Sequence, residues 1–380
     1  MIYFDNSATT KPYKEVLDSF LTVSSEYFGN PSSLHGLGGQ AEKLLSQARD
    51  QVAKLLAVKP SEIYFTSGGT EGNNLAIKGA ALLNKNRGRH LITSSVEHPS
   101  VRAAMEQLEQ EGFEITYLPV DETGRISAAD VEKAIRKETI LISIMHVNNE
   151  VGTVQPIEEV GKILKNYPTI LFHVDAVQSI GKVPLSLTEN RVDFCSISGH
   201  KFHGLKGTGA LYIREGARLA PLFSGGSQER KIRSGTENVA GAVALSKALR
   251  MTMEKSAAGT ERMKKIQSML RTGLNGIEGI NINTPIENAA PHILNFSLNG
   301  LKSEVFIHAL EQREIFVSTT SACSSKKKSP SKTLLEMGVP ESAAESAVRI
   351  SLSFDNTEAE ARTVIEAIEK TVNQLRKVMN

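Results

Sequence analysis

The residue best suited to covalent chemistry is a lysine that lies between two histidines. The stretch SGHKFHGLKG, residues 198–207, places Lys201 between His200 and His203. A lysine amine in this setting can act as a nucleophile, hold a phosphate or be an ordinary surface charge. Desolvation and neighbouring cations lower the pKa of a lysine toward its neutral, nucleophilic form. The rest of the sequence has to decide among these roles.

Polar residues also follow four other predicted strands. Short apolar segments end in SGGTE (67–71), VEHPS (96–100), HVNNE (146–150) and DAVQ (175–178). In an open parallel sheet, ligands bind outside the carboxyl ends of the strands, which lie along one edge. We therefore expect a set of side chains to gather there, namely Thr70, His98, Asn149, Asp175, Gln178, His200 and Lys201.

Each of these segments also has a simpler structural interpretation. The glycine turn can be only a helix cap, and His98 can be a capping or core histidine. Asn149 can simply end its strand, and Asp175 can be a solvated cap. Lys201 alone would be taken for a surface lysine. Because all of these residues fall on the same predicted edge, a common site is favoured over several unrelated features.

The combined set matches the parts of a pyridoxal 5′-phosphate site. Backbone N–H groups of Gly68, Gly69 and Thr70, at a predicted helix N-terminus, can bind a phosphate. Asp175 can keep the pyridine nitrogen protonated, and Lys201 can form an imine with the aldehyde. Amide donors and a flat side chain for stacking complete the set. The sequence therefore predicts this cofactor.

Alternating helices and strands between residues 40 and 200 have to position the site. Apolar residues from Ala41 to Leu56 recur at helical spacing. Short apolar strands are predicted at 62–66, 90–95, 114–120, 139–145, 169–174 and 192–198, with helices between them. The alternation predicts an α/β fold, with a mostly parallel sheet covered by helices on both faces. GALYIR (209–214) and a following short segment are expected to close one edge.

The pattern changes after about residue 255. A polar helix at about 256–276 is followed by mixed strands and helices, which predicts a smaller α+β domain. We expect a large domain over residues 15–255, and a small domain formed by residues 1–14 and 256–380. The first dozen residues are expected to pack against the small domain or to cross the cleft.

Composition narrows the class of protein. The chain has 380 residues and a formal net charge of +2, so nothing favours direct binding to nucleic acid. Its first residues, MIYFDNSATT, lack the features of a secretory signal. No apolar run approaches the roughly 18 residues of a membrane span, so no membrane partner is expected. Two cysteines are too few for a disulfide framework, which favours a reducing cytoplasm.

The two cysteines lie in contrasting surroundings. Cys195 belongs to the apolar segment VDFCSIS and is predicted to be a packed core residue. Cys323 belongs to STTSACSSKKKSPSK, which is predicted to be an exposed loop at about 319–332. The lysines at 326–328 can favour the nucleophilic thiolate of Cys323, although they can also be a solvated charge run.

The whole chain resembles the cysteine desulfurases of the class V aminotransferase group, which are fold-type I pyridoxal phosphate enzymes. Nine motifs in the same order carry the resemblance: YFDNSATT (3–10), FGNPSS (28–33), FTSGGTEGNNLAIKG (65–79), VEHPSV (96–101), SIMHVNNEVG (143–152), HVDAVQSIGK (173–182), SGHKFHG (198–204), RSGTEN (233–238) and SACSS (321–325). Leu205 stands where a proline is common in the family, and Ser227 where a glycine is common. Neither position has a proposed chemical role.

The resemblance implies a role for each matching residue. Lys201 resembles the lysine that binds the cofactor covalently, and Asp175 resembles the partner of the pyridine nitrogen. His98 resembles the stacking ring that assists proton transfer. Asn149 and Gln178 resemble the residues near the phenolic oxygen of the cofactor. The residues that resemble phosphate ligands are Thr70, Ser198 and His200.

Two further residues complete the implied site. Thr236 resembles a residue that reaches the phosphate of the neighbouring subunit's cofactor, which implies a homodimer. Arg349 resembles the clamp for the α-carboxylate of the substrate, a task that suits the forked guanidinium group. Asn149 is also expected at the substrate.

The resemblance implies removal of sulfur from L-cysteine, leaving L-alanine and a persulfide on Cys323 that is passed to a sulfur-acceptor protein. Three pathways would use this chemistry: iron–sulfur cluster assembly, tRNA thiolation and thiamine synthesis. The alternatives are another class V lyase or aminotransferase, such as a selenocysteine lyase, and a scaffold without catalytic activity. No metal ligands are expected.

Overall fold

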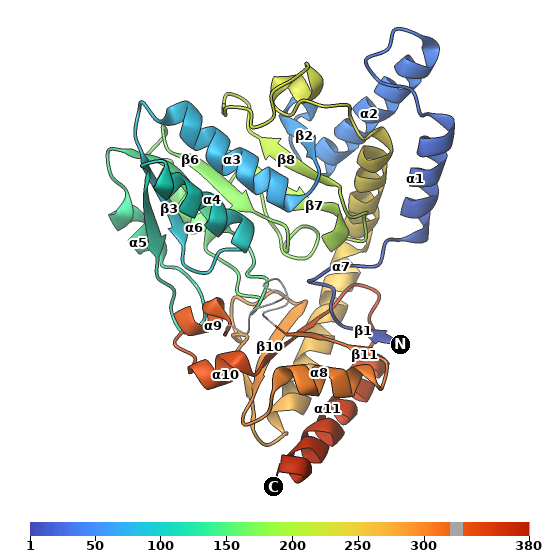
Figure 1. Ribbon diagram of the computed structural model, residues 1–380, viewed down its shortest axis with the longest axis vertical. Coiled ribbons are helices and arrows are strands. Elements are labelled where there is room, and N and C mark those ends of the chain that lie inside the picture. The colour runs from blue at the N-terminus through green and yellow to red at the C-terminus, as the bar shows by residue number, and fades with distance from the viewer. Residues whose placement is uncertain (320–329, 380) are drawn as a thin grey trace.

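The apolar segments predicted as strands form a seven-stranded sheet (Figure 1). The computed structural model describes residues 1–319 and 330–379. In spatial order the strands are β2 (Ile63–Thr66), β8 (Gly209–Ile213), β7 (Phe194–Ser198), β6 (Leu171–Asp175), β5 (Thr139–Met145), β3 (His90–Ser94) and β4 (Glu114–Leu118). Strands β4, β3, β5, β6 and β7 are parallel to one another, which confirms the predicted α/β class.

The prediction that GALYIR closes one edge of the sheet is wrong. Strand β8 lies between β2 and β7 and is antiparallel to both, so that β2 forms the edge. All five residues of β8 are buried, as an interior position requires. A Cβ atom on Gly209 would lie 2.6 Å from the Cα of Gly68. Glycine is therefore needed for β8 to pass next to the turn that follows β2.

Helices cover both faces of this sheet, and alternate residues of each strand point to opposite faces. On one face, α3 (Gly69–Asn84) and α4 (Pro99–Gln110) pack around Leu91, Leu141 and Phe194. On the other face, α2, α5, α6 and α7 pack around Phe172, Cys195 and their neighbours. The bounds of these helices are α2 (Gly36–Leu55), α5 (Ala128–Ala134), α6 (Ile157–Leu164) and α7 (Val239–Asn275).

A second, antiparallel sheet lies in the lower part of Figure 1. Its spatial order is β12 (Ser318–Thr319), β13 (Ala347–Ser351), β10 (Ile293–Leu298) and β9 (Ile280–Ile282). Its core includes residues of α8 (Ser303–Glu311), α7 and α11 (Glu358–Met379). The short helices α9 (Lys332–Glu336) and α10 (Glu341–Glu345) lead from the end of the undescribed segment to β13.

The N-terminal strand β1 (Ile2–Tyr3) pairs with β11 (Ile315–Phe316) in a separate parallel ribbon. Phe4, directly after it, is fully buried in the core of the second sheet. The first residues of the chain are therefore held by residues more than 300 positions later. They lead into α1 (Lys14–Glu26), which packs against α7.

Helix α7 (Val239–Asn275) is longer than the helix predicted at 256–276 and continues without a break from one sheet to the other (Figure 1). Its glycine at position 259 packs closely against Phe354, since a Cβ there would lie 2.4 Å from the aromatic ring. The expected boundary at residue 255 falls inside this helix, and the division into two domains stays a prediction. Within the described residues, no helix has the length and apolar character needed to cross a membrane.

Candidate active site

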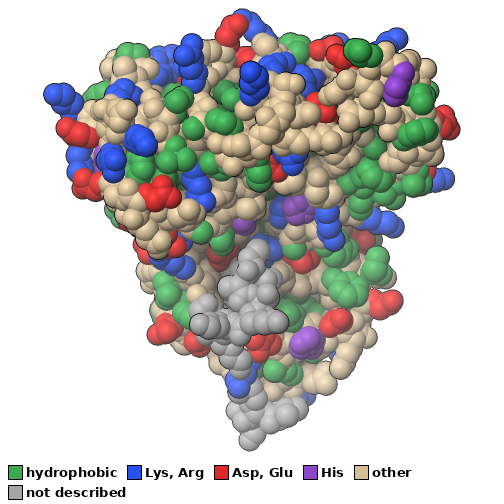
Figure 2. Space-filling model, turned by 45° about the horizontal axis from the view of Figure 1, so that its top comes forward, with side chains coloured by type: hydrophobic (Ala, Val, Ile, Leu, Met, Phe, Trp, Pro, Cys, Tyr) green, Lys and Arg blue, Asp and Glu red, His purple; other side chains and the backbone are tan. Residues whose placement is uncertain are grey.

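The carboxyl ends of the parallel strands open into a cavity of about 550 Å³. Figure 2 shows a hollow between the two parts of the molecule, with histidine and cationic side chains on its wall. The cavity is lined by nine of the predicted residues: Gly69, Thr70, His98, Asn149, Asp175, Gln178, Ser198, His200 and Lys201. The seven residues expected at the strand ends are all among them. Ala8 and Thr9 of the N-terminal segment (residues 5–10) complete part of the lining.

The glycine turn after β2 leads directly into α3. Gly68 has a φ of 152°, which disfavours a side chain at that position. A Cβ atom on Gly69 would lie 2.6 Å from Cγ2 of Val177, so glycine is also needed where the turn passes this side chain. Among the described residues, no side chain caps the N-terminus of α3. Its backbone N–H groups can therefore bind an anion in the cavity.

Asp175, the last residue of β6, is held by two donors. Its Oδ2 accepts a hydrogen bond from Nδ2 of Asn73 at 2.7 Å, and its Oδ1 accepts one from the backbone N–H of Val177 at 3.0 Å. The residue is only 5% exposed. Asn73 also donates to Oγ of Ser100 at 2.9 Å. The contact of Asn73 with Asp175 was not predicted, because only the packing of α3 against the sheet brings Asn73 to the strand end.

His98 combines the structural and the functional interpretation of the sequence. It is the N-cap of α4, where its Nδ1 accepts a hydrogen bond from the backbone N–H of Ser100 at 3.1 Å. Burial lowers the pKa of His98, with Lys201 acting in the same direction and Asp175 opposing it. A neutral ring that accepts at Nδ1 carries its proton on Nε2. His98 therefore caps a helix and presents a neutral ring to the cavity.

Lys201 ends a short 3-10 helix (Gly199–Lys201) after β7. Its Nζ donates hydrogen bonds to the carbonyl oxygens of Ser7 and Ala8, the latter at 2.9 Å. The backbone carbonyl of His200 accepts from the N–H of Thr10 at 2.8 Å. The N-terminal segment thus passes directly over the lysine.

A second lysine, Lys182, lies behind this turn and was not singled out in the sequence. It is 6% exposed, and its Nζ donates to the backbone carbonyl of Lys201 at 3.1 Å. Burial lowers the pKa of Lys182 to about 7, and the charge of Lys201 adds to the effect. Burial and the charges of Lys201, Lys206 and Lys182 likewise lower the pKa of His200 to about 4. Lys182 and Lys206 therefore lie in the electrostatic surroundings of Lys201 and His200.

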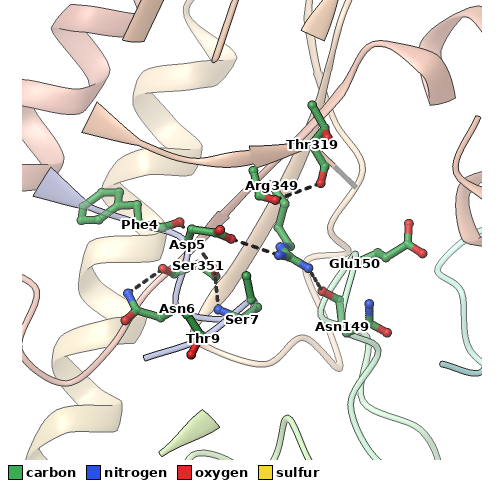
Figure 3. A network of polar contacts seen from close by, with 12 residues as sticks. Phe4, Asp5, Asn6, Ser7, Thr9, Asn149, Glu150, Thr319, Arg349 and Ser351 are labelled. Atoms are coloured by element: carbon green, nitrogen blue, oxygen red, sulfur yellow. Dashed lines mark hydrogen bonds and ion pairs between the residues drawn. The ribbon is translucent and has the colours of Figure 1, made fainter. Parts of the chain in front are cut away.

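Arg349 of β13 does not line this cavity directly but contacts Asn149, which does. Its Nη1 donates to the backbone carbonyl of Asn149 at 2.8 Å, and its Nη2 donates to Oδ1 of Asp5 at 3.1 Å (Figure 3). The residue is 4% exposed, and its Nε has no hydrogen-bond partner among the described residues. A buried guanidinium with donor capacity left can bind a further carboxylate.

Glu150, next to Asn149, contacts two residues that follow the undescribed segment. The hydroxyl of Ser331 donates to its Oε2, and the hydroxyl of Thr333 donates to its Oε1 at 3.2 Å. Burial raises the pKa of Glu150, while these hydroxyls and Arg349 oppose the rise. Cys323 itself and the lysines at 326–328 lie outside the described residues.

Two other predictions concern residues away from this cavity. Cys195 is 1% exposed and belongs to the core of the large sheet, which confirms that it is a packed residue. Its burial raises the pKa of its thiol. Thr236 is exposed and lines a separate cavity of about 160 Å³ that shares Ser67 and Gly207 with the first. The structure of one chain does not bring Thr236 to the other predicted residues.

Comparison with known proteins gives a consistent result over the whole chain. The family model for aminotransferase class-V matches residues 2–364. The chain is 48% identical to a NifS/IcsS protein homolog of Lactobacillus delbrueckii subsp. bulgaricus, covering 100% of this chain and 99% of the relative. It is 43% identical to the cysteine desulfurase IscS of Dictyoglomus turgidum, covering 99% and 96%. A solved NifS-like protein superposes with a TM-score of 0.92 at 41% identity, covering 98% and 99%. The chain therefore belongs to the class V aminotransferase family, and within it to the NifS/IscS-type cysteine desulfurases.

Proposed function

We propose that this protein is a pyridoxal 5′-phosphate-dependent cysteine desulfurase with Cys323 as its sulfur carrier. The reaction removes sulfur from L-cysteine, leaves L-alanine and stores the sulfur as a persulfide. The observation that carries the proposal is the convergence of a lysine, a buried carboxylate and a neutral histidine around one cavity of about 550 Å³. The full-length likeness to a protein named cysteine desulfurase supports the choice of reaction.

The cavity fits the proposed cofactor in three respects. The N-terminus of α3 has no side-chain cap among the described residues and can receive the phosphate, together with Thr70, Ser198 and His200. The Asp175 carboxylate is buried at the strand end and can pair with the pyridine nitrogen. Oε1 of Gln178 is buried and has no hydrogen-bond partner among the described residues, so it can accept from a bound group.

When bound, pyridoxal phosphate supplies an electron sink that weakens the bonds at the α-carbon of the substrate. Arg349 would bind the α-carboxylate of L-cysteine and orient it. Lys201 would hold the cofactor covalently at rest, and its released amine would move the α-proton. His98, with its proton on Nε2, would assist a proton transfer in the cavity.

The bonds that form and break in the sulfur step belong to the substrate and Cys323. The thiolate of Cys323 attacks the substrate sulfur, an S–S bond forms and the Cβ–S bond breaks. The electron pair of the broken bond stays with the substrate carbon, which takes up a proton on the way to L-alanine. The sulfur leaves as the outer atom of a persulfide, which is then passed to a sulfur-acceptor protein.

Two features support a homodimer. Phe28 is 70% exposed and Leu34 is 106% exposed, in a segment between α1 and α2. Exposed large apolar side chains close together are typical of an interaction surface. The separate position of Thr236 also agrees with a role toward the cofactor of a second copy of this chain. The presence of only two cysteines supports a cytoplasmic location.

The proposal is tested with L-cysteine as the substrate and separate measurements of alanine, sulfide and protein persulfide. We expect Cys323→Ser to keep the visible absorbance of the bound cofactor and to lose persulfide formation. Cys195→Ser is the matched control and should leave both unchanged, because this thiol is a buried core residue. Consumption of an oxoacid without sulfide would instead indicate an aminotransferase, and a strong preference for selenocysteine would indicate a selenocysteine lyase. Damage by the Cys195 change alone would show that the sulfur carrier is misassigned.

A further inference from the structure

The guanidinium of Arg349 is already paired with a carboxylate of its own chain. The Asp5 Oδ1 accepts from Nη2 of Arg349 at 3.1 Å, while Nη1 donates to the carbonyl of Asn149 at 2.8 Å (Figure 3). The side chains of Arg349 and Asp5 are 5% and 21% exposed, so the pair is largely shielded from water. A shielded ion pair fixes the plane of the guanidinium much more firmly than an exposed one.

The backbone of Asp5 is itself held in place. Asp5 forms an isolated parallel bridge with Ser351, and the N–H of Ser7 donates to Oγ of Ser351 at 2.8 Å. Nδ2 of Asn6 donates to the carbonyl of Ser351 at 3.0 Å. Phe4, on the other side, is fully buried. Because Ser351 and Arg349 belong to the same strand, the carboxylate is anchored to the element that carries the guanidinium.

The charges around this pair are unevenly distributed. Burial raises the pKa of Asp5, while Arg349, Lys201 and the hydroxyl of Ser318 oppose the rise. Arg349 also opposes the rise in the pKa of Glu150, although its ion pair is with Asp5. The proton of Tyr3 is retained more strongly, its pKa being raised to about 12 by burial and by the charge of Asp5. A ligand that brings additional negative charge next to Arg349 therefore meets the carboxylate of Asp5, which is already there.

We propose that Asp5 is a positioning and specificity-determining residue for the substrate. It holds Arg349 in the orientation that receives an α-carboxylate, and its fixed negative charge selects against amino acids with acidic side chains. The inference rests on the proposed function, in which Arg349 binds the α-carboxylate. It concerns which amino acids are admitted, rather than the sulfur chemistry.

Two substitutions separate orientation from charge. Asp5→Asn keeps an oxygen that can accept from Nη2 but removes the negative charge. Asp5→Ala removes both the acceptor and the charge. Since L-aspartate carries one more negative charge than L-alanine, the loss of the Asp5 charge should favour L-aspartate more than L-alanine.

The experiment uses the full-length protein loaded with its cofactor, and measures dissociation constants of L-alanine and L-aspartate by calorimetry. For Asp5→Asn we expect the preference for L-alanine over L-aspartate to fall by about three- to tenfold, the range expected for one partly shielded charge interaction. For Asp5→Ala we expect kcat/KM for L-cysteine to fall by about tenfold or more, mostly through KM, because the guanidinium loses its support. Asp18→Asn, an exposed acid on α1, is the matched control and should change neither quantity.

The outcomes distinguish this inference from the proposed function. An unchanged preference in Asp5→Asn would overturn the selective role of Asp5, and an unchanged kcat/KM in Asp5→Ala would overturn its positioning role. If Arg349→Gln leaves the L-alanine dissociation constant unchanged, the clamp itself is misassigned and the proposed function has to be revised. Thermal unfolding of each variant shows whether it is folded, and Asp5→Asn alone decides the question of selectivity if Asp5→Ala does not fold.

Discussion

Two buried basic residues, Lys182 and Arg349, contact the backbone of residues that line the cavity, but only Arg349 is paired with a carboxylate. On the sheet side, Lys182 donates to a backbone carbonyl, and none of the ion pairs among the described residues includes it. On the opposite side, Arg349 is paired with Asp5. Burial lowers the pKa of Lys182 to about 7. The side of the parallel sheet therefore keeps a titratable amine next to Lys201, whereas the opposite side keeps a permanent charge that is compensated by a carboxylate.

The largest expected effect comes from removing Lys201, which lines the cavity. Lys201→Ala should lower desulfurase activity by more than about a thousandfold, because a covalent and proton-transferring group is lost. The visible absorbance of the bound cofactor should disappear as well. Absorbance spectra and alanine release measure the two effects. Lys14→Ala removes an exposed lysine of α1 and serves as the control. A variant that keeps the absorbance band would remove Lys201 from its assigned role.

Arg349→Lys should break the ion pair with Asp5 while keeping the positive charge at position 349. The ammonium group cannot reproduce the fork that contacts Asp5 and the carbonyl of Asn149 at the same time. We expect kcat/KM for L-cysteine to fall by about 30- to 100-fold, with most of the change in KM. Steady-state kinetics measure it, and Arg313→Lys, at an exposed position between α8 and β11, is the control. A loss confined to kcat would argue against binding as the function of Arg349.

Lys182→Met should change how the free energy of unfolding depends on pH. The folded pKa of about 7 lies below the ordinary value of 10.5, so between these values the unfolded chain binds the proton and the folded chain does not. The contribution of Lys182 to the free energy of unfolding therefore rises with pH in this window. Relative to Lys182→Met, the unsubstituted protein should gain about 2 kcal/mol between pH 7 and pH 9.

Urea unfolding of the cofactor-free proteins at pH 7 and pH 9 measures this difference. Lys54→Met, at an exposed position of α2, should show no such pH dependence relative to the unsubstituted protein. Parallel stability curves for the unsubstituted protein and Lys182→Met would mean that the ammonium of Lys182 is not held in a desolvated environment.

The sheet side of the site could be predicted from sequence because regular alternation fixes where strand ends fall. Once β5, β6 and β7 are parallel, Asn149, Asp175 and Lys201 have to follow neighbouring ends. The position of β8 could not be predicted, since it depends on a close contact between two glycines that are far apart in sequence.

The partners of these residues were also beyond sequence reasoning. Asn73 reaches Asp175 only through the packing of a helix on the sheet, and Lys182 reaches the turn at Lys201 only through tertiary contacts. Asp5 and Arg349 are separated by 344 positions. Local patterns identify which residues can do chemistry, whereas the contacts that orient them are set by segments that fold together from distant parts of the chain.

The pairing of β1 with β11 has a consequence for protein synthesis. Strand β1 is synthesised more than 300 residues before its partner at Ile315–Phe316. At typical rates of about 5–20 residues per second, the N-terminal residues wait roughly 15 to 60 seconds for that partner. Ser351 and Arg349, which fix Asn6 and Asp5, follow later still. The residues that contact the Lys201 amine therefore gain their support from β11 and β13 only after more than 300 further residues have been made.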